Sequence, residues 1–121
     1  MAAAKKHACD AWNAAADAMV GSRQPFIDKT QPGMTWDWND PAIQSAQAQA
    51  QAGTITQVEY LRRNVPPATP PEVANPISDY IAASIDMIAA DGQHQPAAVA
   101  NAAANRGSAA AAKIRTACGI R

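Results

Sequence analysis

Two histidines are the residues of this sequence best suited to acid–base chemistry or to binding a metal ion or haem. His7 lies near the start of the chain, and His94 lies between two segments with helical patterns. In an antiparallel bundle of those helices the two imidazoles would stand roughly 35 Å apart, at about 1.5 Å of rise per residue. They therefore cannot share a site, and we interpret each of them as a solvated surface histidine.

The carboxylates do not form a recognisable active site either. Asp37 and Asp40 flank Trp38, but Asp40 is already explained as a helix cap, and the acidic residues of the expected helices fit solvated faces or local ion pairs. The sequence has no Ser/His/Asp order with a nucleophile elbow, no glycine-rich phosphate loop and no HExxH motif. We therefore expect a protein that is not an enzyme and that has no cofactor and no metal site.

The two cysteines, Cys9 and Cys118, lie about a hundred residues apart. This spacing matches neither metal ligands nor a CxxC redox motif, so we predict a disulfide bond between them. Closing so long a loop stabilises a fold by about 4–5 kcal/mol in the chain-entropy model. The bond implies an extracytoplasmic location, either in the cell envelope or secreted. The alternative is two unrelated buried thiols in a cytosolic protein.

Export would require a leader that this sequence does not show. Lys5 and Lys6 give the start of the chain a positive charge, but no apolar segment follows them. No apolar run approaches the roughly 20 residues that are needed to cross a bilayer. An extracytoplasmic location therefore implies that a signal peptide or a membrane anchor was removed.

The composition favours helices around a thin core. Alanine accounts for 31 of the 121 residues, and the chain has a single leucine, Leu61. Alanine has the best helix propensity but buries little apolar area, so a covalent staple would help such a domain. Ten basic and ten acidic residues cancel, which argues against binding to nucleic acid.

The hydrophobic pattern predicts four helices in a single domain covering residues 1–121. The first covers about Ala3 to Val20 and ends at Gly21-Ser22. The second begins at Asp40-Pro41 and continues to Asn64, with a possible kink at Gly53-Thr54. The third begins at a capping box formed by Thr69 and Glu72, includes Pro76 and ends at Gly92. Its apolar positions are Val73, Ile77, Tyr80, Ile81, Ile85, Met87 and Ile88.

The fourth helix runs from Pro96 to Cys118 and has a narrow, nearly smooth face. This face consists of Val99, Ala103, Gly107, Ala110, Ile114 and Cys118. Short connections between successive helices predict an all-α, up-down-up-down four-helix bundle. In that topology the first and last helices are antiparallel neighbours, which places Cys9 beside Cys118. The smooth face could also support a homodimer.

Residues 21–40 form the longest expected irregular stretch, and they contain five large apolar side chains. These residues are Phe26, Ile27, Met34, Trp36 and Trp38. Loops near 20 residues are uncommon in compact domains and are usually functional or folded back onto the core. In one interpretation the aromatic side chains fill gaps that the alanine-rich helices leave. In the other, the two tryptophans border a site for a partner or ligand.

The remaining candidate is a binding site for an apolar cofactor. Met19, Tyr60, Tyr80 and Met87 could contact a flat apolar molecule if the bundle opened a cavity. Packing in the core explains the same residues without a ligand, and alanine-rich helices pack closely and leave little room.

The phrases CDAW, SDYIAASIDMIAADGQ and AAAAKIRTACG, with the terminal cysteines and the abundant alanine, resemble small exported proteins of mycobacteria and related actinobacteria. Within that group, the small all-helical mycobacterial haemophores also have a cysteine near each end of the helical domain. This sequence lacks their internal histidine-containing segment, so the resemblance assigns no haem-binding residue here.

These observations lead us to expect a non-enzymatic helical domain of the cell envelope, either a protein-interaction module or an accessory subunit. Its expected partner is another envelope protein, and the expected contact residues are Phe26, Met34, Trp36 and Trp38. The alternative is a carrier of haem or of another apolar small molecule.

Overall fold

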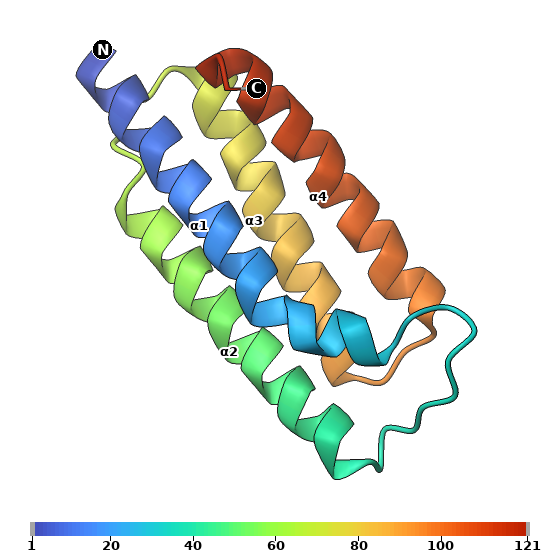
Figure 1. The fold of residues 1–121 in the computed structure, drawn as a ribbon. Helices are drawn as coiled ribbons and strands as arrows, with labels where there is room; N and C mark the ends of the chain where they lie inside the picture. Colours follow the sequence, from blue (N-terminus) through green and yellow to red (C-terminus); the bar gives the residue numbers. More distant parts are fainter. Residues whose placement is uncertain (1, 121) are drawn as a thin grey trace.

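The computed structural model describes residues 2–120, which form an all-α four-helix bundle. The helices are α1 (Ala2–Lys29), α2 (Pro41–Arg63), α3 (Pro71–Gly92) and α4 (Ala97–Cys118). Successive helices run in opposite directions, so that the connections lie alternately at the two ends of the bundle (Figure 1). The predicted fold class and topology are confirmed. No helix among the described residues is long and apolar enough to cross a membrane.

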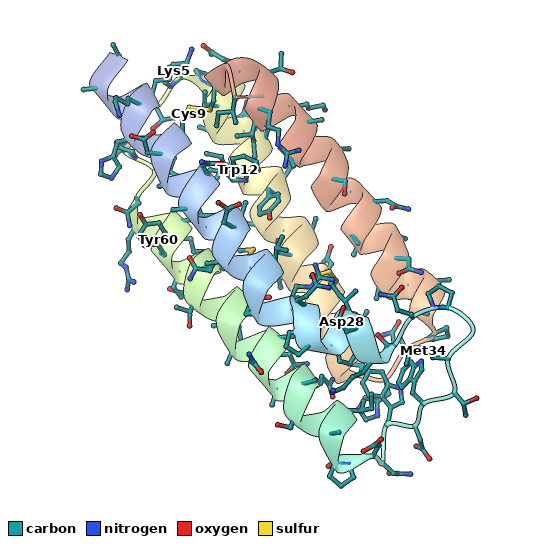
Figure 2. The ribbon with its side chains drawn as sticks, in the orientation of Figure 1. Lys5, Cys9, Trp12, Asp28, Met34 and Tyr60 are labelled. Carbon is teal, nitrogen blue, oxygen red and sulfur yellow. A yellow bond between two sulfur atoms is a disulfide. The ribbon has the colours of Figure 1, made fainter. Side chains whose placement is uncertain are left out.

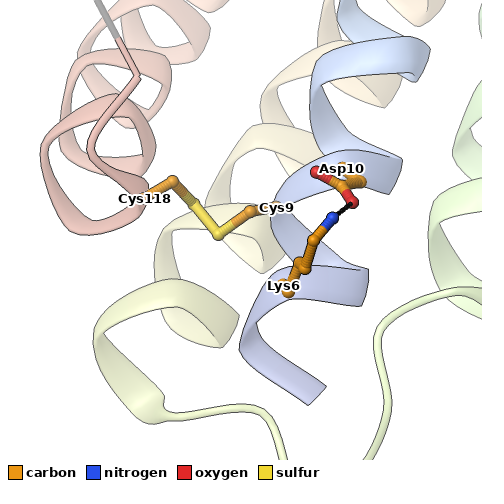
Figure 3. The surroundings of a disulfide bond; sticks show 4 residues. All are labelled: Lys6, Cys9, Asp10 and Cys118. Carbon is orange, nitrogen blue, oxygen red and sulfur yellow. Dashed lines mark hydrogen bonds and ion pairs between the residues drawn. A yellow bond between two sulfur atoms is a disulfide. The ribbon is translucent and has the colours of Figure 1, made fainter. Parts of the chain in front are cut away.

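The disulfide between Cys9 and Cys118 is present and joins α1 to α4 (Figure 3). The two Cα atoms are 5.8 Å apart, within the range usual for disulfides. Elsewhere α1 and α4 contact each other sparsely, whereas α1 packs closely on α2 and α3 packs closely on α4. The bond therefore fastens two helix pairs together at one end of the bundle.

The first helix is longer than the sequence indicated, and the predicted end at Gly21-Ser22 is wrong. Helix α1 continues through Pro25 to Lys29. The continuation places Phe26 in the core with 8% of its surface exposed, and this burial outweighs the poor helix propensities of glycine and proline. The irregular connection is correspondingly shorter, and it covers residues 30–40.

The start of α2 is capped as predicted, whereas the start of α3 is not. The Ala42 N–H donates a hydrogen bond to Asp40 Oδ1 at 2.9 Å. At α3 the N-cap position belongs to Pro70, which has no side chain able to accept a hydrogen bond. The predicted capping box therefore does not form. The Thr69 hydroxyl is instead buried without a hydrogen-bond partner among the described residues.

The apolar side chains form two core clusters. The larger one lies at the disulfide end, and its largest fully buried side chains are Trp12, Leu61, Ile77, Ile114 and Val73. The smaller one lies at the opposite end and consists of Phe26, Ile43, Ala46 and Ala50, with Trp36 and Trp38 packed against it. The apolar positions predicted for α3 are not all buried, because Tyr80, Ile81, Ile85 and Ile88 keep part of their surface exposed.

Candidate binding site

Three of the four residues expected to bind a partner meet in one aromatic cluster, which consists of Phe26, Trp36 and Trp38. The rings of Phe26 and Trp38 are nearly stacked, and their centroids are 5.8 Å apart. The Trp36 ring meets the other two edge to face, at centroid distances of 6.5 Å to Phe26 and 4.9 Å to Trp38. Both tryptophans are half-buried, so they pack against the smaller core and keep part of their surface exposed.

His94 extends the aromatic cluster from the connection between α3 and α4. Its imidazole lies parallel to the Trp38 indole, with ring centroids 4.2 Å apart. His94 has a backbone φ of 53°, a left-handed conformation that is uncommon for residues other than glycine. The stacking joins the two connections at this end of the bundle.

Met34, the fourth expected contact residue, lies beside the aromatic cluster in the connection between α1 and α2. Half of its surface is exposed, and it borders a cavity together with Trp36. Figure 2 shows Met34 near the end of the bundle opposite Trp12 and the disulfide. Met34 and the exposed parts of Trp36 and Trp38 therefore form the accessible portion of the predicted partner site.

A groove runs between α1 and α4, with α3 as its floor. Its upper part, nearer the disulfide, encloses about 250 Å³. The lining residues of the upper part are Trp12, Ala16, Met19, Val20, Arg23, Tyr80, Ala83, Ser84, Met87, Ala103, Ala104, Gly107, Ser108, Ala111 and Arg115. Most of the α4 residues in this set are alanine or glycine, and their small side chains leave the space open.

The lower part of the groove lies toward the aromatic cluster and encloses about 450 Å³. It shares Arg23, Met87 and Ala104 with the upper part, so the two adjoin each other. Its other lining residues are Phe26, Ile27, Thr30, Gln31, Pro32, Gly33, Met34, Trp36, Asp91, Ala97, Ala100 and Asn101. The sequence did not indicate this groove, because its width depends on how far α1 and α4 separate below the disulfide.

Charged groups occupy the middle of the groove. Arg23 and Asp91 are both half-buried there. Burial lowers the pKa of the Arg23 guanidinium, an effect that Asp91 and Tyr80 partly oppose, although an arginine remains charged in proteins. Burial likewise raises the pKa of the Asp91 carboxyl, and Arg23 only partly opposes this change. Sequence patterns alone give no sign that these distant residues lie close enough for their charges to interact.

Trp12 and Arg115 form the upper end of the groove wall. The Arg115 guanidinium lies over the Trp12 ring, 5.4 Å from its centroid, and Tyr80 meets the same ring edge to face at 5.7 Å. The Trp12 indole N–H is buried and has no acceptor among the described residues. Tyr80 is half-buried, and burial raises the pKa of its phenol.

The remaining candidate residues lie apart from one another. His7 is exposed near the start of α1, where its Nε2 lies 3.0 Å from Asn64 Oδ1, and His94 is at the other end of the bundle. Of the residues expected around an apolar cofactor, Met19, Tyr80 and Met87 line the groove, whereas Tyr60 packs against the larger core. Residues 2–120 contain no group of three His, Cys, Asp or Glu side chains suited to hold a metal ion.

The chain belongs to the Rv2240c four-helix bundle domain family, which it matches over residues 1–119. The family is named after a gene of Mycobacterium tuberculosis. No curated protein and no solved structure matches the chain. Membership of this family is consistent with the resemblance to mycobacterial proteins and with the observed four-helix bundle.

Proposed function

We propose that this domain is not an enzyme and acts in the cell envelope by binding another protein, as an interaction module or accessory subunit. The observation that carries the proposal is the aromatic cluster with Met34 beside it at one end of the bundle. The disulfide between Cys9 and Cys118 is consistent with an oxidising compartment.

The aromatic cluster has the properties of an interaction anchor. Its rings are held by stacking and edge-to-face contacts, so little side-chain freedom is lost when a partner binds. Tryptophan is enriched among the few interface residues that supply most of the binding energy. Trp36 and Trp38 contribute partly exposed rings, and Met34 contributes an adaptable apolar side chain next to them.

A crosslinking pull-down from envelope extract tests this proposal, with the oxidised domain as bait. Met34→Ser is the informative variant, because Met34 is half exposed and its replacement leaves the core unchanged. Ile55→Ser is the matched control, since Ile55 is 52% exposed on α2 and lies outside the proposed surface. We expect one protein to be captured by the parent and the control but lost with Met34→Ser. Equal capture by all three would contradict the proposed surface.

The tryptophans need a second test because they also pack against the smaller core. We expect Trp36→Ala or Trp38→Ala to weaken binding of the partner, while circular dichroism shows unchanged helicity. Unfolding of both variants would mean that the tryptophans serve the core, and the proposed anchor would fail.

The groove between α1 and α4 favours a second candidate function, a carrier of haem or of another apolar small molecule. Its lower part, of about 450 Å³, falls in the size range of small-molecule sites, the adjoining upper part of about 250 Å³ is smaller, and both have mainly apolar linings. For haem, Tyr80 is the oxygen ligand available in the groove, whereas His7 and Tyr60 lie outside it. A Soret band that develops on titration and is lost in Tyr80→Phe would support haem, and a flat titration would exclude it.

A further inference from the structure

Charge is distributed unevenly along the groove between α1 and α4. The upper part is bordered by Arg23 and Arg115, and no aspartate or glutamate is among its described lining residues. The lining of this part therefore offers two guanidinium groups, of which Arg23 is partly offset by Asp91 in the lower part and Arg115 is not.

The lower part of the groove has a different character. Arg23 is accompanied there by Asp91, so the two charges cancel. The rest of the lining is dominated by apolar side chains from α1, α4 and the connection after α1. These are Phe26, Ile27, Pro32, Met34, Trp36, Met87, Ala97, Ala100 and Ala104. Such a surface gains free energy by covering an apolar chain.

The volume limits the occupant to one chain. A water molecule takes up about 30 Å³ in the liquid, and a methylene group is of similar size, so 450 Å³ holds about fifteen such groups. The 250 Å³ of the upper part then remains for a polar head group. A molecule with two acyl chains would exceed the lower part.

We propose that this groove binds a long-chain fatty acid, with its carboxylate between Arg23 and Arg115 and its acyl chain along the lower part toward Met34 and Trp36. The carboxylate supplies the negative charge that the lining of the upper part lacks, and charge-assisted hydrogen bonds to guanidinium groups are among the stronger ones in proteins. The proposal rests on the carrier candidate, and its acyl-chain part shares Phe26, Met34 and Trp36 with the proposed protein-binding surface.

Isothermal titration of the oxidised domain with dodecanoate, below its micelle-forming concentration, tests the proposal. Dodecyltrimethylammonium, with the same chain length and a positive head, is the matched ligand control. We expect dodecanoate to bind with one-to-one stoichiometry and at least about tenfold more tightly than the cation. Equal affinities would overturn the assignment of the head group to the arginines.

Variants separate the two parts of the site. Ala104→Leu narrows the groove where its two parts meet, whereas Ala102→Leu adds the same side chain on the exposed side of α4. We expect the first to weaken dodecanoate binding about tenfold or more and the second to leave it unchanged. An unchanged affinity in Ala104→Leu would show that the ligand binds elsewhere.

A second pair of variants tests the role of the arginine charge at the proposed head-group site. Arg115→Gln should weaken the binding of dodecanoate about tenfold. Arg63→Gln, which removes an exposed charge from α2, should leave the affinity unchanged. Equal losses in both variants would point to net charge alone and overturn the proposed head-group site. If dodecanoate fails to bind but haem does, the fatty-acid proposal fails while the carrier function stands.

Discussion

Ser22 of α1 lies so close to Gly53 of α2 that a Cβ atom added at position 53 would stand 2.3 Å from both the Cβ and the Oγ of Ser22. Real Cβ atoms do not approach so closely, so the absence of a side chain at Gly53 is what allows the two helices to pack here. The Ser22 hydroxyl also donates a hydrogen bond to the Met19 carbonyl at 3.1 Å. Gly53 is therefore a packing residue, and α2 runs uninterrupted through it from Pro41 to Arg63.

Gly53→Ala should destabilise the protein, although alanine has the better helix propensity by about 1 kcal/mol. We expect a net loss of about 1–3 kcal/mol in the free energy of unfolding, because α1 and α2 must separate to admit the methyl group. Urea denaturation followed by circular dichroism measures the change. Gly21→Ala is the control, since nothing lies within 4 Å of its added Cβ, and it should stabilise by about 0.5–1 kcal/mol. Stabilisation by both substitutions would contradict the close packing at Gly53.

The disulfide between Cys9 and Cys118 should supply a large share of the stability, because it closes a loop of 109 residues. Replacing both cysteines by alanine is expected to lower the free energy of unfolding by about 4–5 kcal/mol in the chain-entropy model. The parent treated with reductant should behave like the double variant, and the double variant should not respond to reductant. A loss below about 1 kcal/mol would mean that helix packing alone holds α1 to α4.

Local signals in the sequence were sufficient for much of the fold. Asp40 followed by Pro41 marked the start of α2, and the positions of Cys9 and Cys118 identified both the disulfide and the neighbouring terminal helices. The end of α1 was missed because Gly21 and Pro25 are helix-ending signals, whereas the burial of Phe26 depends on residues that are distant in sequence.

The aromatic residues of the candidate site could be predicted, but the groove could not. The small side chains of α4 indicated a face that neighbouring helices approach closely. Ala110 is indeed buried away from the groove, whereas Ala100, Ala103, Ala104 and Gly107 line the groove. The pattern of residue sizes is the same in both cases, and only the separation of α1 from α4 distinguishes them.

The parallel stacking of His94 on Trp38 should shield the indole and hold the two connections together. His94→Asn removes the ring while keeping a residue type that tolerates the left-handed backbone. We expect a loss of about 0.5–1.5 kcal/mol in stability and stronger acrylamide quenching of Trp38 fluorescence, measured with Trp36 replaced by phenylalanine.

His7→Asn is the control for the stacking experiment, because His7 lies on α1 at the opposite end of the bundle. It should leave the quenching of Trp38 unchanged. The remaining tryptophan, Trp12, is only 1% exposed and contributes little to quenching. Unchanged quenching in His94→Asn would show that the stack does not form in solution.

Asp91 should make stability depend on pH in an unusual direction for a carboxylate. Burial raises its pKa above the ordinary value of 3.8, and the nearby Arg23 only partly opposes this effect. The folded protein therefore holds the proton more tightly than the unfolded chain does. It follows that the carboxyl favours folding below its unfolded pKa, and that this contribution is lost as the pH rises through the folded pKa.

Asp91→Asn keeps the shape of the side chain but removes its charge, so it should be more stable than the parent at neutral pH. We expect a gain below about 1 kcal/mol, because solvent screens a half-buried group, and the gain should vanish below pH 3.8. Urea denaturation across this pH range measures the difference. Asp17→Asn, an exposed change on α1, should follow the parent throughout. If Asp91→Asn is instead less stable than the parent at neutral pH, attraction by Arg23 outweighs burial, and Asp91 stabilises the lower part of the groove.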